Sequence, residues 1–292
     1  MVIFFVTKPH DYTLREVLAA TSPGSIAVVY YGDAFPARRV PQATYVFSDL
    51  DRLNPVGIAR AADLYRQLTR AGYRTLNDPA RFVCRLALLR RLYAAGINQF
   101  TAYPAVPTPS PERWPVFLRL DAGHRSPLTG LLADPAELAH ETAAALGAGA
   151  SPEQLIVVEF SAEPLACGVW RKLSVYRVGD RLFADSCVHE RNWMAKIGPE
   201  GIAPADVYAD ELRLMRENPH GQAMLRVFEL AGVEYGRVDF GLVSGLPSVY
   251  EVNTNPHVEF LPETSSPFRN ETRRLFRDHY LSALAALAAS AA

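Results

Sequence analysis

Four polar side chains near the carboxyl end of the chain have the types and spacing of a metal and phosphate site. Arg237 and Asp239 are separated by one residue, and so are Glu251 and Asn253. Side chains alternate across an extended strand, so each pair shares one face of its strand. If the two faces coincide, two carboxylates and an amide oxygen surround one point beside an arginine. Hard oxygen ligands of this kind suit Mg²⁺, which takes one or two carboxylates together with substrate phosphates.

Two β-rich runs carry these residues. Residues 235–243 and 248–253 flank the sequence SGLP at 244–247, whose glycine and proline predict the turn of an antiparallel hairpin. The opposite face of the first run is apolar. A solvated hairpin with polar residues facing water explains any single carboxylate equally well. Because the polar residues are in phase on both strands, the set as a whole favours the metal site.

These runs also resemble a known motif. Arg237-Val-Asp239-Phe followed by Glu251-Val-Asn253-Thr-Asn-Pro resembles the metal-binding hairpin of the ATP-grasp superfamily, which includes carboxylate–amine ligases similar to D-alanine:D-alanine ligase and glutathione synthetase. In that family the matching Asp, Glu and Asn hold Mg²⁺ on the ATP phosphates, and the Arg contacts the phosphates or the reacting acyl group. The resemblance implies ATP and Mg²⁺ as cofactors, with Mn²⁺ as a substitute ion.

The resemblance implies an ATP-grasp fold of the α/β (α+β) class, in which two α+β subdomains clasp ATP behind a small N-terminal α/β domain. We expect these three domains at residues 1–78, 79–160 and 161–292. Apolar runs at 2–6 and 26–31, separated by a segment of helical spacing, agree with an open α/β layer. Asn54 and Pro55 predict a helix start, and Asp78 with Pro79 predicts a second helix that runs to Ala95.

By the resemblance, four residues of the central domain contact the nucleotide phosphates. Arg85, on the predicted helix, and Arg119, on the strand WPVFLRL, stand where the family usually carries lysines. Gly123 and Ser126 lie in the loop that follows, where the family has a mobile phosphate-covering loop, because glycine lets backbone N–H groups approach phosphate. Arginine keeps the charge but differs from lysine in reach and geometry.

Further contacts are also implied by the resemblance. His124 and Arg125, at the loop tip, would add positive charge unless they are simply exposed. Glu159 and Phe160 end an apolar strand and would lie at the adenine edge. Glu163 would bind the ribose hydroxyls, although an ordinary exposed carboxylate explains it as well. Lys172, on a second predicted hairpin at 170–178 and 181–188, would reach phosphate or substrate, although a lysine that keeps a sheet edge soluble looks the same.

The implied activity is ATP-dependent ligation. ATP would phosphorylate a small-molecule or peptide carboxylate, and an amine or amino acid would displace phosphate from the acyl phosphate. Arg237 and Lys172 would be the catalytic residues, and Thr254, Asn255 and His257 lie close enough in sequence to touch the acceptor. Two alternatives stay open: a kinase of the same fold that phosphorylates a hydroxyl, and a nucleotide-binding module without turnover, which the Arg-for-Lys departures favour.

Composition limits the other classes of function. The 292 residues carry a net charge of -1, which gives no electrostatic footprint for nucleic acid or an anionic membrane. The three cysteines contain no CxxC pair, so neither a disulfide framework nor a zinc site is indicated, and a reducing cytoplasm is expected. No apolar run approaches the ~20 residues of a membrane helix, and the opening MVIFFVT lacks the basic start of a signal peptide. A homodimer is left open.

Overall fold

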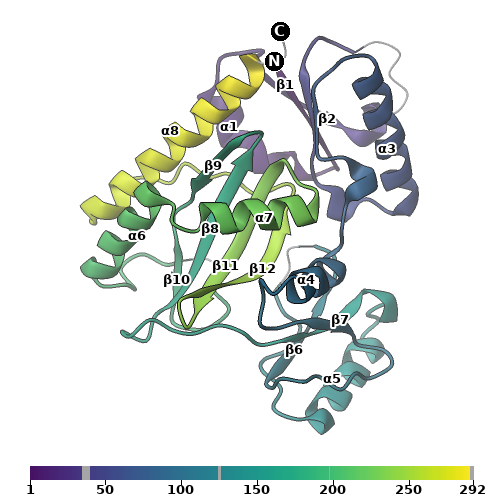
Figure 1. Cartoon of the computed structure of the whole chain (residues 1–292), viewed down its shortest axis with the longest axis vertical. Helices are drawn as coiled ribbons and strands as arrows, with labels where there is room; N and C mark the ends of the chain where they lie inside the picture. The colour runs from purple at the N-terminus through teal and green to yellow at the C-terminus, as the bar shows by residue number, and fades with distance from the viewer. Residues whose placement is uncertain (35–39, 124–125, 197, 290–292) are drawn as a thin grey trace.

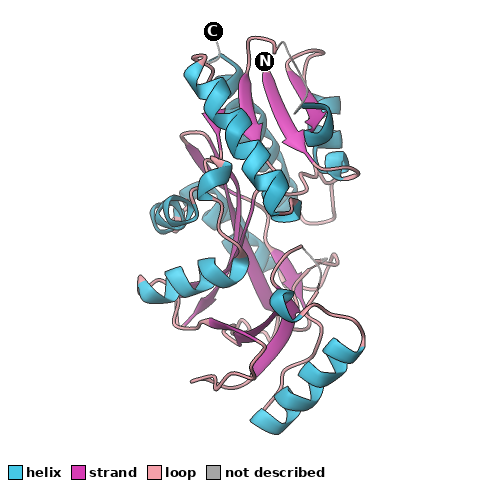
Figure 2. Ribbon diagram, turned by 90° about the vertical axis from the view of Figure 1, so that its right-hand side faces the viewer, coloured by secondary structure: helices cyan, strands magenta, loops and turns pink. Residues whose placement is uncertain are grey.

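Three β-sheets follow one another along the chain (Figures 1 and 2). The computed structural model describes residues 1–34, 40–123, 126–196 and 198–289, so His124 and Arg125 lie outside the described residues. Figure 1 shows the N-terminal sheet and the central sheet at opposite ends of the molecule, with the C-terminal sheet between them. The architecture is mixed α/β, as the sequence predicted.

The N-terminal sheet is parallel and has the strand order β2-β1-β3-β4. All five residues of β1 are buried, as expected for a parallel strand covered on both faces. Asn54 caps α3 by accepting a hydrogen bond from the Gly57 N–H, and Pro55 occupies the first turn, which confirms the predicted start. The elements of this region are β1 (Val2–Val6), η1 (His10–Leu14), α1 (Arg15–Ala20), β2 (Ile26–Tyr30), α2 (Tyr31–Ala34), β3 (Thr44–Phe47), η2 (Leu50–Arg52), α3 (Pro55–Arg70) and β4 (Thr75–Leu76).

The predicted helix from Asp78 to Ala95 is wrong in its first half. Asp78 does cap a turn, by accepting from the Ala80 N–H, but that turn is the short 3-10 helix η3 (Pro79–Arg81). The chain then runs extended to α4 (Arg85–Ala94). Phe82 packs on the core of the N-terminal sheet and Val83 on the core of the C-terminal sheet. Packing against two cores therefore overrides the local helical pattern.

The central sheet is antiparallel, with the order β5-β7-β6. One of its faces packs against α5, whose N-cap Asp134 accepts hydrogen bonds from two backbone N–H groups. Leu89 of α4 packs with the other face, while Leu88 and Leu92 pack against the C-terminal sheet. Helix α4 thus joins the two sheets. The elements are β5 (Ala102–Pro104), β6 (Val116–Leu120), α5 (Pro135–Gly147), η4 (Pro152–Gln154) and β7 (Leu155–Glu159).

The C-terminal sheet is also antiparallel, with the order β10-β8-β11-β12 and β9 paired to β8. The second strand of the hairpin predicted at 181–188 is shorter than expected, because β9 ends at Ala184 and β10 pairs separately with the start of β8. The elements are β8 (Trp170–Val178), β9 (Arg181–Ala184), β10 (Val188–Glu190), α6 (Ala205–Glu217), α7 (Gly221–Ala231), β11 (Tyr235–Val243), β12 (Leu246–Asn253) and α8 (Pro267–Ala289).

The hairpin of β11 and β12 forms with a tighter turn than predicted. Only Ser244 and Gly245 lie between the strands, with φ of 50° and 78°, which is the two-residue turn with positive φ at both positions that suits a right-twisted hairpin. Leu246 and Pro247 belong to β12. Because β12 is the edge strand, the missing N–H of Pro247 is tolerated.

The first and third sheets share one core. Phe4 of β1, Tyr235 of β11 and Tyr280 of α8 are fully buried in one cluster, and the Tyr235 and Tyr280 hydroxyls lie 2.7 Å apart. Asn77 joins the same two sheets. Its amide donates to the Phe47 and Tyr235 carbonyl oxygens and accepts from the backbone N–H groups of Glu234 and Tyr235. Among the described residues, no helix has the length and apolar character needed to cross a membrane.

Candidate active site

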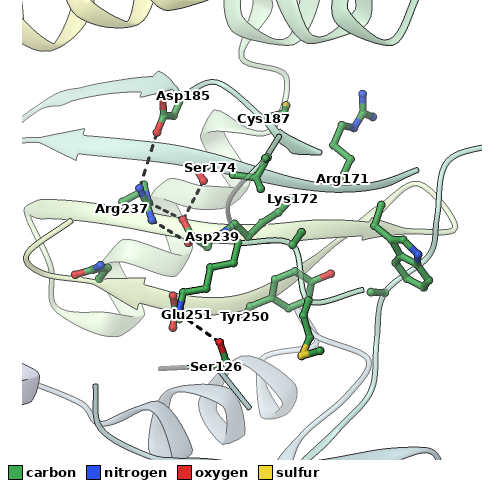
Figure 3. A pocket seen from close by; sticks show the side chains of 18 of the residues that line it. Ser126, Arg171, Lys172, Ser174, Asp185, Cys187, Arg237, Asp239, Tyr250 and Glu251 are labelled. Atoms are coloured by element: carbon green, nitrogen blue, oxygen red, sulfur yellow. Dashed lines mark hydrogen bonds and ion pairs between the residues drawn. The ribbon is translucent and has the colours of Figure 1, made fainter. Parts of the chain in front are cut away.

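The register of the C-terminal hairpin brings its polar residues together. Asp239 of β11 lies directly opposite Glu251 of β12, and Arg237 lies opposite Asn253. Directly opposed side chains of an antiparallel pair share a face, so all four residues project from the same side of the sheet. The coincidence of the two polar faces that the alternation predicted is therefore present. Figure 3 shows Arg237, Asp239 and Glu251 on this surface.

This surface forms part of a cavity of about 570 Å³. A volume of this order is typical of small-molecule sites. Residues of the C-terminal sheet form one wall of the cavity, and residues of the central sheet form the wall that faces it. Ten of the predicted site residues line it: Arg119, Ser126, Glu159, Phe160, Glu163, Lys172, Arg237, Asp239, Glu251 and Asn253. Arg85 and Gly123 do not line it.

Asp239 is buried and surrounded by donors. Its Oδ1 accepts from Ser174 Oγ at 2.9 Å and from Arg237 Nε at 2.7 Å. Its Oδ2 accepts from Lys172 Nζ and from Arg237 Nη2, both at 3.1 Å (Figure 3). Burial by itself would raise the pKa of Asp239, but Arg237 and Lys172 outweigh it and hold the pKa below its ordinary value. The side chain is thus an anion whose lone pairs all face protein donors.

Glu251 faces two arginines of the central region. Its Oε2 accepts from Arg85 Nη2 at 2.6 Å and lies 3.6 Å from Arg119 Nη2. Burial, and then the neighbouring Arg85, lowers the pKa of Arg119 to about 10. Two cations of the central region therefore converge on this one carboxylate.

Arg85 does not line the cavity, and its contact with nucleotide phosphate stays a prediction. Its guanidinium donates to the carbonyl oxygens of Leu120, Asp121 and Gly123, at 3.0, 2.8 and 3.1 Å, in addition to Glu251. The side chain fixes the start of the loop after β6 to the hairpin. Gly123 takes part in this contact through its carbonyl oxygen, and its φ of 81° is a conformation that favours glycine.

The Glu159 carboxylate turns into its own sheet. It accepts hydrogen bonds from the N–H groups of Thr101, Glu112 and Arg113, and from the Tyr103 hydroxyl at 2.8 Å. These bonds leave the carboxylate in a structural role, since it is buried and satisfied by four donors. Any portion of Glu159 that meets a ligand is therefore main chain, as the adenine-edge prediction assumed.

Phe160 belongs to an aromatic wall of the cavity. Its ring lies 5.6 Å from Trp193 and 6.1 Å from Trp170, and Trp193 lies 5.1 Å from Phe117. Tyr250 adds to this apolar surface: a bulge after Asp239 leaves Tyr250 as the extra residue of β12. A Cβ on Gly241 would meet the Tyr250 hydroxyl, so a larger residue there would displace the ring.

Glu163 lies at the rim of the cavity and is exposed. Its carboxylate accepts from the Ser244 N–H at 2.8 Å, in the turn of the hairpin. Nearby, the Ser161 and Ser248 hydroxyls lie 2.9 Å apart. Both contacts hold the chain after β7 against the hairpin, so Glu163 has a structural partner whether or not it meets ribose.

The structure adds Ser174 and Asp185, two residues that the sequence interpretation missed. Ser174 bonds to Asp239, and Asp185 lies 4.0 Å from Arg237 with its pKa raised to about 6 by burial. Lys196 Nζ lies 3.4 Å from Ser126 Oγ, so two loops meet over the cavity. Ser174 follows Lys172 by two residues, and the same alternation would have found it. Asp185 follows a strand in a loop and carries no such signal.

The segment after β12 meets the N-terminal region. Thr254 Oγ1 accepts from the Leu50 N–H at 3.2 Å, and Thr13 Oγ1 donates to Asn255 Oδ1 at 2.9 Å. The side chains of Thr13, Thr254 and Asn255 are buried, and each takes part in one of these hydrogen bonds. His257 is about half exposed and lines the cavity, with its Nδ1 3.3 Å from Glu259 Oε1. Of the three predicted acceptor contacts, His257 and Asn255 line the cavity and Thr254 does not.

The side-chain oxygens of the hairpin are of the kind that a divalent cation prefers, but they do not form a complete coordination shell. Asp239, Glu251 and Asn253 present two carboxylates and an amide on one face. Asn253 Oδ1 accepts from the Asn255 N–H at 2.8 Å. Among the residues that the structure describes there is no group of three or more His, Cys, Asp or Glu that could hold a metal. A cation here therefore completes its coordination with oxygens of water or of a ligand, as Mg²⁺ does when it binds with substrate phosphates.

Comparisons with known proteins agree with this architecture. No protein-family model and no curated protein sequence matches the chain. Among solved structures, the D-alanine–D-alanine ligase of Bacillus anthracis complexed with ATP aligns with a TM-score of 0.58 and 13% identity, over 100% of this chain and 97% of that one. The ligase of Coxiella burnetii gives 0.55 and 12% over 98% and 96%, and that of Aeromonas hydrophila gives 0.51 and 18% over 97% and 98%. The chain therefore has the ATP-grasp fold of the D-alanine–D-alanine ligases.

Proposed function

We propose that this protein is an ATP- and Mg²⁺-dependent ligase that joins a carboxylate to an amine or amino acid. The observation that carries the proposal is the register of the hairpin, which sets Asp239 opposite Glu251 and Arg237 opposite Asn253 on one wall of the cavity. The similar ATP-bound ligase supports the choice of nucleotide. We take residues 79–160 and 161–292 as the two subdomains that clasp it, behind the N-terminal domain of residues 1–78.

Asp239, Glu251 and Asn253 would hold the Mg²⁺ ion, or Mn²⁺ in its place, against the ATP phosphates. The ion would neutralise charge that develops during phosphoryl transfer. Because all four acceptor positions of Asp239 face protein donors, a cation must replace one of them. Lys172 is the donor best able to leave, since its flexible stem and point charge can turn to a phosphate oxygen.

The positive groups of the cavity divide between two tasks. Arg119 and Lys172 would bind the nucleotide phosphates, with Ser126 and the loop after β6 above them. Arg237 would face the acyl phosphate and then the oxyanion of the tetrahedral intermediate. Arg237 is held by Asp239 and lies near Asp185, so its orientation is fixed before substrate arrives. Phe160 and the aromatic wall would hold the base.

The reaction needs no protein nucleophile. A carboxylate oxygen of the donor attacks the γ-phosphorus of ATP and releases ADP, which gives the acyl phosphate. The nitrogen of the acceptor then attacks the acyl carbon, loses a proton and expels phosphate. Positioning and electrostatic stabilisation account for the rate in such a scheme.

The test is a screen of amino acids and small carboxylates for ADP and phosphate release in the presence of Mg²⁺. We expect at least one pair of substrates to give both products, and Asp239→Asn and Glu251→Gln to abolish release while circular dichroism shows an intact fold. Arg66→Gln, on the exposed face of α3, is the matched control and should behave as wild type. Full activity in either carboxylate variant would remove the metal assignment, and a phosphorylated product without free phosphate would show a kinase.

A further inference from the structure

We propose that Arg52 binds a substrate carboxylate that does not react, at the end of the cavity formed by the N-terminal region. This inference rests on the proposed ligase function and adds the chemical class of its substrate. Either the acceptor is an amino acid and not a simple amine, or the donor is a dicarboxylate.

The position of Arg52 follows from the N-terminal sheet. The carboxyl ends of its parallel strands meet at one edge, where loops in open α/β sheets meet ligands. Among the described residues, Tyr12, Thr13 and Arg52 are the members of this region that line the cavity. Hydrogen bonds from Leu50 to Thr254 and from Thr13 to Asn255 fix these loops to the segment directly after Asn253. The loop that carries Arg52 therefore borders the cavity beside the segment that follows Asn253.

Arg52 is held at one edge of its guanidinium. Its Nη1 donates to Asp49 Oδ1, and Asp49 is the side-chain partner that the described stretches of the chain give it. Asp49 is fully buried and also accepts from the Thr7 N–H at 3.0 Å. The Arg52 side chain keeps 20% of its surface exposed. An arginine fixed at one edge can offer its other donors to a planar carboxylate in a bidentate arrangement.

Two further polar side chains at this end of the cavity contact each other. His257 and Glu259 form a pair at 3.3 Å, and the Tyr12 ring packs edge-on against His257 with centroids 5.4 Å apart. An ammonium group would have to compete with His257 for Glu259. A carboxylate meets an aromatic surface and a prepared guanidinium instead. The chemistry of this end therefore selects an anionic group of the substrate.

The inference is tested by calorimetric binding of defined probes, with and without a non-hydrolysable ATP analogue and Mg²⁺. The amino acid probes are glycine, L-alanine, D-alanine and L-glutamate, each compared with its α-carboxamide. The diacid probes are succinate and glutarate, each compared with its monoamide. The proteins are wild type, Arg52→Gln, which keeps an N–H donor for Asp49, Arg52→Lys, and the control Arg66→Gln.

We expect wild type and the control to prefer acids to amides, and Arg52→Gln to lose at least about tenfold of that preference. Arg52→Lys should keep some of it, because charge remains while the bidentate geometry is lost. Loss confined to the amino acids identifies the acceptor, and loss confined to the diacids identifies the donor. Equal binding of acid and amide by wild type, or an unchanged preference in Arg52→Gln, would overturn the inference.

Binding of the ATP analogue distinguishes a failure of this inference from a failure of the proposed function. Arg52→Gln should bind the ATP analogue within about twofold of wild type, and weaker binding in that variant alone would contradict a local role for Arg52. If instead wild type does not bind the analogue while its acid preference, measured without nucleotide, depends on Arg52, the ligase proposal fails and the carboxylate site stands.

Discussion

Two equally buried carboxylates of this protein have opposite electrostatics. Asp239 and Glu211 are each 1% exposed. Asp239 receives four hydrogen bonds, and its pKa lies below the ordinary value. Glu211 receives one from Arg269 Nη1 at 3.1 Å, its Oε1 has no hydrogen-bond partner among the described residues, and burial raises its pKa to about 7. The two neighbouring cations Arg237 and Lys172, and not a difference in the depth of burial, keep Asp239 charged.

Glu211 belongs to a buried polar cluster that lies mostly away from the cavity. His189 Nδ1 lies 3.3 Å from Arg269 Nη1, and the Arg269 guanidinium covers the Tyr208 ring at 5.0 Å. Burial, and then Arg269, lowers the pKa of His189 to about 3, so the ring is neutral. Of this cluster only Arg269 lines the cavity. The Glu211 cluster joins β10 to α6 and α8, whereas the residues around Asp239 line the cavity.

The largest expected effect comes from Lys172→Met, which breaks the contrast by removing a donor from Asp239. Turnover should fall by about 10²–10³-fold, because one preorganised donor to a phosphate is lost. In the absence of nucleotide, the same variant should bind Mn²⁺ about tenfold more tightly, because a cation that competes for Asp239 is gone. Steady-state ADP release and Mn²⁺ titration by electron paramagnetic resonance measure the two changes.

Lys172→Arg is the comparison variant for this prediction. It keeps the charge beside Asp239, so Mn²⁺ binding should stay near the wild-type value while turnover falls through altered geometry. A Lys172→Met protein that loses turnover without any gain in Mn²⁺ affinity would show that the lysine does not occupy the position of the cation.

The second prediction concerns Glu211, the carboxylate whose pKa is raised by burial. The pKa of Glu211 rises from its ordinary 4.5 to about 7 on folding, so the folded state holds this proton more tightly than the unfolded state. The stability that this contributes is complete below pH 4.5 and is lost as the pH rises through 7. Relative to Glu211→Gln, wild type should therefore lose up to roughly 3 kcal/mol of unfolding free energy across that interval.

Urea unfolding of both proteins at pH 5, 6, 7 and 8 measures this difference. Turnover at pH 7.5 should be unchanged by Glu211→Gln within about twofold, because the residue does not line the cavity. A difference in stability that is independent of pH would mean that the carboxylate is already ionised at pH 5, and the contrast with Asp239 would disappear.

The smallest effect concerns Glu163, which has a structural partner and a proposed ribose contact. If the carboxylate binds ribose, Glu163→Gln should raise the KM for ATP by about tenfold, since a hydrogen bond to a charged group is worth about 1.5–3 kcal/mol. The melting temperature should fall only slightly through the weakened contact with Ser244. A lower melting temperature with an unchanged KM would show that Glu163 stabilises the turn of the hairpin and does not bind ribose.

The sequence was sufficient for the features that depend on local periodicity. Alternation placed Arg237, Asp239, Glu251 and Asn253 on shared faces, and the antiparallel register then set those faces together. The apolar runs of the three sheets were likewise visible, as was the cap at Asn54. These features arise from neighbours in sequence, so a single chain reveals them.

The remainder of the site depends on contacts between distant segments. The guanidinium of Arg85 meets Glu251 across 166 positions, and no local pattern shows that it ties a loop instead of facing ligand. The direction of the Glu159 carboxylate is decided by N–H groups of the segment before β6. Arg52 lines the cavity because its loop docks on Thr254 through the Leu50 N–H. Such arrangements follow only from the tertiary fold.

The buried amide of Asn77 has a mechanical consequence. It fastens the N-terminal sheet to the start of β11, and the shared core of Phe4, Tyr235 and Tyr280 reinforces that attachment. The first and third sheets must then travel as a single rigid piece. If the protein is the ligase that we propose, the cavity would open for nucleotide by movement of the three-stranded sheet, which we expect to swing on α4 and the short chain that follows β7.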